Sequence, residues 1–179
     1  LFTSLLTDDC IARGKALLDG GVRYLGGTNE TYGNINTSDS LWVIRDLVFN
    51  QKKYTLRQLN DAMLANFNGY EALRKDCLNC DKYGNDLETA DTMANDLYEF
   101  VAKGVRNRGI AIGMQYFLIV ISNNQLNTEW GNRTAASPDG RLSCMYMNPA
   151  NNPQGGANKS GPTAMLNSLA KFDAKYHGG

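Results

Sequence analysis

The chain has 179 residues, of which 42% are hydrophobic, and its 18 basic and 18 acidic side chains cancel to a formal net charge of zero. This composition is typical of a soluble globular protein, and the lack of any basic run argues against nucleic-acid binding. The longest apolar run, residues 116–121, is too short to span a bilayer, and no basic-then-apolar leader begins the chain. We therefore expect no membrane segment and no secretion.

The first 34 residues predict one helix, one short strand and a polar loop. Apolar side chains recur through residues 4–18, which predicts a helix with several leucines available for burial, and Gly20-Gly21 ends it as a C-cap. Residues 22–25 are long enough for a short strand, and residues 26–34 follow as a glycine-rich loop.

Capping residues and apolar spacing then predict a series of further helices. Ser38 or Asp39 caps the first, Thr55 caps the second, and residues 70–78 form a short third helix. The turn at residues 82–86 leads into the longest helix. Its apolar stripe, which is more typical of plain core than of a cofactor site, comprises Leu87, Ala90, Met93, Ala94, Leu97 and Val101.

Residues 115–122 form a continuous apolar and β-branched run, which predicts a strand buried on both faces in a parallel sheet under helices. Few strands, many helices and a polar loop after each strand indicate an α/β fold, whose ligands bind at the carboxyl ends of the strands. Because a sheet of about three strands is incomplete, we expect the chain to be a segment of a larger barrel or sheet.

A turn, a long polar loop and a capped helix are predicted in the last third of the chain. Residues 137–140 have the composition of a turn, and residues 144–147 suit a short strand. Residues 148–161 hold no helix or strand pattern, and Pro162 then opens an amphipathic helix. Polar loops of this length are usually functional or disordered, although a well-capped surface loop is the simpler alternative.

The sequence holds no complete catalytic set. Its cysteines are Cys10, Cys77, Cys80 and Cys144, and His177 is its single histidine. The C-x-x-C pair is either redox-active or half of a zinc site, but a zinc site needs about two more ligands. We therefore expect no metal, ordinary thiols in a reducing compartment, and no catalytic residue within the chain.

Six motifs, in order and at approximate spacing, resemble the glycyl radical enzymes, the family of pyruvate formate-lyase and the radical diol dehydratases. They are LFTSLLTDDCIARGKALLDGGVRY at residues 1–24, NTSDSL at 36–41, LVF at 47–49, KYGND at 82–86, SPDGR at 137–141 and GPTA at 161–164. The resemblance covers nearly the whole chain.

The resemblance implies that residues 1–179 are one segment of a ten-stranded α/β barrel, helix-rich and with few strands. The catalytic cysteine loop lies upstream of this segment and the radical glycine lies downstream, so neither is in the chain. The chain then binds no cofactor itself, because a separate activase with S-adenosylmethionine and an iron–sulfur cluster installs the glycyl radical in the complete enzyme. The other implied partners are a small-molecule substrate, the rest of the barrel and a second copy in a homodimer, in an anaerobic cytoplasm.

Family members line their substrate pocket with the loop before the GPTA helix. Here that loop reads YMNPANNPQ, where many members carry serine, aspartate and glycine, so the resemblance leaves the substrate class open. We predict that the substrate-binding residues are Asn148, Asn151, Asn152, Pro153 and Gln154, because neutral amides both donate and accept hydrogen bonds. The alternative is that these amides only satisfy the backbone of the loop.

Two functions follow from the resemblance. The first is the barrel segment of a radical lyase, dehydratase or decarboxylase, such as a formate acetyltransferase-like enzyme, that acts on a small polar metabolite. The second is a non-catalytic fragment or remnant that serves as a scaffold or assembly partner.

Overall fold

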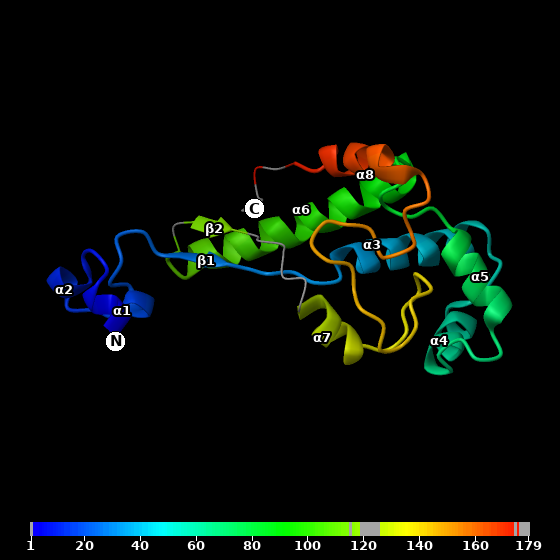
Figure 1. Cartoon of the computed structure of the whole chain (residues 1–179), viewed down its shortest axis with the longest axis horizontal. Helices are drawn as coiled ribbons and strands as arrows, with labels where there is room; N and C mark the ends of the chain where they lie inside the picture. The colour runs from blue at the N-terminus through cyan, green and yellow to red at the C-terminus, as the bar shows by residue number, and fades with distance from the viewer. Residues whose placement is uncertain (1, 115, 119–125, 174, 176–179) are drawn as a thin grey trace.

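Helices predominate in the structure, and two short strands pair beside them (Figure 1). The computed structural model describes residues 2–114, 116–118, 126–173 and 175. In chain order the elements are α1 (Phe2–Leu5), α2 (Cys10–Arg13), η1 (Leu17–Asp19), β1 (Gly26–Thr28), α3 (Asn34–Val43), η2 (Ile44–Asn50), α4 (Leu56–Leu64), α5 (Glu71–Asn79), α6 (Glu88–Ala111), β2 (Tyr116–Leu118), α7 (Leu126–Asn132) and α8 (Gly161–Ala170). None of the described helices is long and apolar enough to cross a membrane.

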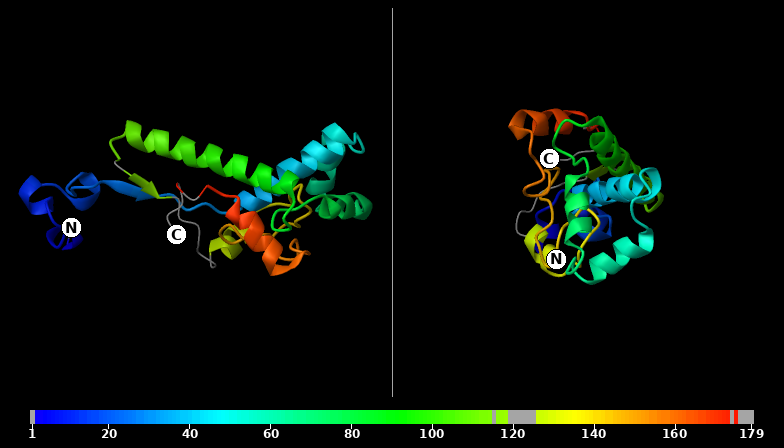
Figure 2. Two further views of the ribbon diagram at one scale, coloured as in Figure 1. Left: turned by 90° about the horizontal axis from the view of Figure 1, so that it is seen from above. Right: turned by 90° about the vertical axis from the view of Figure 1, so that its right-hand side faces the viewer.

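The two strands form a parallel pair, with Gly26 opposite Tyr116 and Thr28 opposite Leu118. A parallel pair requires a crossover connection between its strands. Here the connection runs through the helices from α3 to α6, and α6 brings the chain back to β2 (Figure 2). The molecule is elongated: α1 and α2 lie at one end beyond the strands, and α4 and α5 lie at the other (Figure 1).

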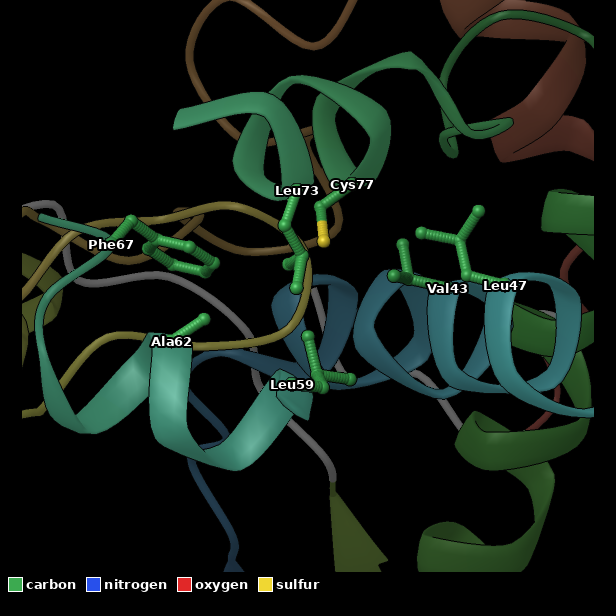
Figure 3. Close-up of a cluster of buried hydrophobic side chains, with 7 residues drawn as sticks. All are labelled: Val43, Leu47, Leu59, Ala62, Phe67, Leu73 and Cys77. Atoms are coloured by element: carbon green, nitrogen blue, oxygen red, sulfur yellow. The ribbon is translucent and has the colours of Figure 1, made fainter. Parts of the chain in front are cut away.

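The larger hydrophobic core joins α3, η2, α4 and α5 (Figure 3). Its buried side chains are Val43, Leu47, Leu59, Ala62, Phe67, Leu73 and Cys77. Thr55 starts α4 as predicted, with a reciprocal cap: the Thr55 hydroxyl accepts from the Gln58 N–H at 3.2 Å, and the Gln58 amide oxygen accepts from the Thr55 N–H at 2.9 Å.

A second region of core lies between α3 and α6. Ile35 of α3 packs with Ala94 of α6 and with Tyr83, which is fully buried. Phe172, just after α8, meets Tyr83 and Tyr98 edge-on, with ring centroids 5.5 and 5.4 Å apart. These contacts fasten the C-terminal helix to the long helix.

Several predicted elements are confirmed. The predicted helix at residues 70–78 is α5, the turn at residues 82–86 precedes α6, and Pro162 lies in the first turn of α8. The predicted apolar stripe on α6 is confirmed in part: Ala90 and Ala94 are buried, but Leu87 lies just before the helix and is 38% exposed. Tyr98, which the prediction did not include, is also buried.

The predicted helix over residues 4–18 is wrong. Left-handed backbone at Asp9 and Gly14 breaks this stretch into α1, α2 and η1, and Leu6 and Leu18 are 73% and 89% exposed. The predicted strand at residues 22–25 is also wrong, since pairing begins at Gly26, inside the predicted loop.

Two further predictions near the loops are corrected. Ser38 and Asp39 are not caps: α3 begins at Asn34 after Gly33, whose φ of 73° suits glycine, and both side chains lie buried inside the helix. Residues 144–147 form no strand. Of the predicted strand at residues 115–122, β2 covers 116–118, and the rest lies outside the described residues.

We expect the isolated 179-residue chain to self-associate. The described sheet has two strands, and large apolar side chains such as Phe2, Leu18 and Phe100 are at least 74% exposed. Unpaired strand edges and exposed apolar faces both favour association. Size-exclusion chromatography with light scattering tests this expectation, and a monodisperse, cooperatively melting monomer would contradict it.

Candidate functional site

A buried network of amides holds the polar loop between α7 and α8 against α3. Residues 148–160 form neither helix nor strand, as predicted, and the loop depends on partners elsewhere in the chain for its shape. In Figure 1 this loop runs beside α3 before it rises to α8.

Asn36, which is 5% exposed, is the centre of this network. Its amide nitrogen donates to Oδ2 of Asp139 at 2.7 Å and to Oε1 of Gln154 at 3.0 Å. Its amide oxygen accepts from the N–H of Asn148 at 2.8 Å, and its own N–H donates to Oδ1 of Asn148 at 3.2 Å. The first N–H groups of a helix have no intrahelical acceptor, so Asn148 caps α3 from a distant part of the sequence.

The turn at residues 137–140 is confirmed and is joined to the network by Asp139. The N–H of Gly140 donates to the carbonyl of Ser137 at 3.0 Å, and the Ser137 hydroxyl donates to Oδ1 of Asp139 at 2.5 Å. The buried guanidinium of Arg141 donates to the carbonyl groups of Ala135, Leu142 and Met145. Within residues 144–147, the carbonyl groups of Met145, Tyr146 and Met147 accept from the side chains of Arg141, Gln154 and Asn127 and not from a neighbouring strand, and the predicted strand does not form.

The structure divides the five predicted substrate-binding residues. Asn148 is fully buried, and Gln154 donates to the carbonyl of Tyr146 at 3.1 Å while its oxygen accepts from Asn36. Both ends of these two amides therefore have partners within the chain. Asn151 and Pro153 are half-buried, and Asn152 is exposed.

Two glycines allow close contacts in the residues that directly follow Asn152. A Cβ atom at Gly84 would lie 2.8 Å from Cγ of Pro153, and one at Gly155 would lie 1.8 Å from the hydroxyl oxygen of Tyr146. Pro153 and Gly155 are therefore held against neighbouring groups, and the exposed Asn152 side chain projects from a braced backbone.

A pocket of about 200 Å³ lies beside the loop. Its charged lining consists of Asp39, Arg74, Lys82, Asp139, Arg141 and Lys159, and Gln154 is the member of the predicted five that reaches it. Sequence reasoning missed Asn36 and Asp39 as site residues. The available signal was their spacing of three residues in a helix, which places two polar side chains on a face expected to be apolar.

Asp39 is the most perturbed carboxyl group in this region. It is 1% exposed, Oδ1 accepts from the N–H of Tyr83 at 3.0 Å, and Oδ2 has no partner among the described residues. The pKa of Asp39 is raised to about 7, chiefly by burial. The nearby carboxylates of Asp139 and Asp91 also raise this pKa, whereas the Tyr83 N–H and Lys82 lower it.

The C-x-x-C pair has the environment of unreactive thiols. Burial raises the pKa of Cys77 to about 12 and that of Cys80 to about 11, which keeps both sulfurs protonated near neutral pH. The described residues contain no group of three or more histidine, cysteine or acidic side chains that could hold a metal ion. His177 lies outside the described residues.

Parallel strands joined through helices, with a braced polar loop beside them, place the chain in the α/β class of folds. Residues 1–126 match the family described as Pyruvate formate lyase-like. The chain is 34% identical to trans-4-hydroxy-L-proline dehydratase of Clostridioides difficile, over 98% of this chain and 22% of that protein. It is 33% identical to (2S)-3-sulfopropanediol dehydratase of Klebsiella oxytoca, over 96% of this chain and 21% of that protein.

The structure superposes on the glycerol-bound B12-independent glycerol dehydratase of Clostridium butyricum with a TM-score of 0.87 and 31% identity, over 98% of this chain and 22% of that one. The chain therefore belongs to the pyruvate formate lyase-like family of glycyl radical enzymes. Its relatives are dehydratases, lyases and decarboxylases of small polar substrates. The chain spans about a fifth of their length.

We expect Asn36→Ala to destabilise the fold and release the loop. The substitution leaves the Asn148 N–H and one Asp139 oxygen buried without partners, at about 1–3 kcal/mol for each group. Urea denaturation measures the loss. Asn60→Ala, on an exposed face of α4, is the matched control and should change stability by less than about 0.5 kcal/mol. Equal effects of the two substitutions would contradict the role given to Asn36.

We expect Asp39→Asn to stabilise the protein more at about pH 7.5 than at about pH 5. The folded-state pKa of Asp39 is raised from the ordinary carboxyl value of 3.8 to about 7, so in this window the folded state keeps a proton that the unfolded state releases. Stability therefore falls as pH rises through the window, by up to a few kcal/mol at roughly 1.4 kcal/mol per pKa unit. Unfolding midpoints of both proteins at both pH values test this, and a constant difference would refute it.

Proposed function

We propose that the complete protein is a glycyl radical enzyme that acts as a dehydratase, lyase or decarboxylase on a small polar metabolite. The observation that carries this proposal is the match of 98% of the chain, at a TM-score of 0.87, to a radical dehydratase with glycerol bound. The chain supplies a segment of the α/β barrel, which in our proposal is ten-stranded, and a loop for the substrate pocket.

Within that loop the braced geometry supports two different roles. Asn148 and Gln154 keep the loop on α3, because their amides are already hydrogen-bonded within the chain. Asn152, with Asn151 and Pro153 on either side, presents an exposed amide that can donate to and accept from a hydroxyl, carbonyl or carboxylate group. A held backbone lowers the entropy cost of such a contact.

The proposed chemistry needs parts that the chain does not supply. The catalytic cysteine loop and the radical glycine belong to other segments of the complete protein. A separate activase that uses S-adenosylmethionine and an iron–sulfur cluster installs the radical. We further propose that the complete enzyme is a homodimer and that it works in an anaerobic cytoplasm.

A non-catalytic remnant is the second candidate. It is favoured by Asn148 and Gln154, because their amides already hydrogen-bond within the chain and need no substrate as a partner. The mass of the natural polypeptide separates the two candidates. A mass of 19.7 kDa at 22% of a relative's length corresponds to about 90 kDa for the complete enzyme. A natural product near 20 kDa would support the remnant.

In the complete enzyme we expect Asn152→Ala to lower turnover by about tenfold or more and to leave the radical intact. Loss of one hydrogen bond that is matched to substrate costs about 1–3 kcal/mol. Gln154→Ala should lower turnover similarly, with a loss of stability because Asn36 loses a partner. Electron paramagnetic resonance gives the spin per protomer, and turnover is measured on the same samples.

Asn60→Ala again serves as the control and should leave both spin and turnover unchanged. Full spin with impaired turnover in Asn152→Ala supports a pocket role for this residue. Unimpaired turnover would remove Asn152 from the proposed site, and a joint fall of spin and turnover would indicate misfolding.

A further inference from the structure

The pocket beside the loop is lined by Asp39, a buried aspartate with one carboxyl oxygen that nothing in the described residues satisfies. Asp39 lines the pocket and is 1% exposed, and Oδ2 has no hydrogen-bond partner there, while Oδ1 is used by the N–H of Tyr83. Nearly all buried polar atoms in folded proteins are paired with protein, water or ligand. The free Oδ2 is therefore a position where a ligand's donor would be favoured.

Two cations on the same lining also have unused donors. Arg74 donates through Nε to the carbonyl of Gly140 at 2.9 Å, and its terminal nitrogens have no acceptor among the described residues. Lys159 donates through its backbone N–H to Asn85 at 2.7 Å, and its ammonium group has no partner there. These two groups suit the acid group of a ligand, because a guanidinium and an ammonium bind carboxylates strongly.

The other charges of the lining already have partners within the chain. The ammonium group of Lys82 donates to the carbonyl of Cys77 at 2.5 Å. The Arg141 guanidinium donates to the carbonyl groups of Ala135, Leu142 and Met145. Asp139 accepts from Asn36 and Ser137. The unsatisfied groups are thus Oδ2 of Asp39, the terminal nitrogens of Arg74, the ammonium group of Lys159 and the two remaining N–H donors of Lys82, within a volume of about 200 Å³. At roughly 30 Å³ per water molecule, this space suits a ligand of about six to eight non-hydrogen atoms.

We propose that this pocket binds a small organic anion that also carries a hydroxyl or ammonium group. Its acid group contacts Arg74 and Lys159, and its hydroxyl or ammonium hydrogen is donated to Oδ2 of Asp39. The assignment rests on the pocket itself and goes beyond the radical chemistry proposed above.

Isothermal titration of the complete protein, before the radical is installed, tests the site with three matched probes. (S)-Lactate carries both required groups, propionate lacks the hydroxyl, and lactamide lacks the charge. We expect lactate to bind with one site per protomer, and propionate and lactamide to bind at least tenfold more weakly.

Substitutions locate the binding. Arg74→Gln and Lys159→Gln should each weaken lactate binding several-fold and leave the preference for lactate over propionate. Asp39→Asn should abolish that preference, since the amide nitrogen cannot accept a hydrogen bond. Arg57→Gln, the same charge change at an exposed position on α4, is the control and should leave binding unchanged.

The proposal is overturned if lactate fails to bind at millimolar concentration, if the three probes bind equally, or if the pocket substitutions act like Arg57→Gln. Should Asp39→Asn fail to fold, the probe comparison and the two cation variants still decide the outcome. Because no turnover is measured, absence of radical activity does not affect this test, and absence of lactate binding does not bear on radical activity.

Discussion

The reciprocal hydrogen bonding between Asn36 and Asn148 is the constraint on which the rest of the site depends. Two residues 112 positions apart exchange backbone and side-chain hydrogen bonds in a buried setting. The loop contributes few apolar contacts of its own, so hydrogen bonds to a helix replace the packing that usually orders a segment. In return, Asn148 caps the start of α3. The helix and the loop therefore stabilise each other's conformation.

Asp139 extends this coupling to a second segment. The same side chain accepts from Asn36, from the Ser137 hydroxyl and from the N–H of Arg141. A buried carboxylate with several donors and a neighbouring guanidinium is well compensated, whereas Asp39 of α3 has one oxygen without a partner among the described residues. The two buried aspartates therefore differ in how far the chain itself satisfies them.

Local patterns predicted the elements that depend on local chemistry. The Thr55 cap, the turn at residues 137–140 and Pro162 at the start of α8 all rest on contacts within a few residues. The motifs of the resemblance placed the chain in its family, and residues 1–126 match that family independently.

Predictions that required distant partners failed. β1 forms over a glycine-rich segment because its backbone pairs with β2, about 90 residues later, and no side-chain pattern shows this. Ser38 and Asp39 look like caps in isolation, but they are buried by packing of α3 against α6 and the loops. The sequence did not show which amides of the loop are hydrogen-bonded within the chain and which are exposed. That distinction depends on Asn36, which bonds to Asn148 and Gln154 from a distant part of the sequence.

The close approaches at Gly84 and Gly155 have a consequence for how the loop can diverge. A side chain at Gly84 would collide with the ring of Pro153, and the φ of +89° at this position also favours glycine, so it tolerates almost no replacement. A side chain at Gly155 would require the exposed Tyr146 ring to move aside. Asn152, which precedes both contacts, meets no such restriction, because its side chain is exposed and its backbone N–H donates to the carbonyl of Pro149. Natural variation can therefore exchange this one side chain, and with it the chemistry offered to a bound molecule, while the path of the chain stays the same.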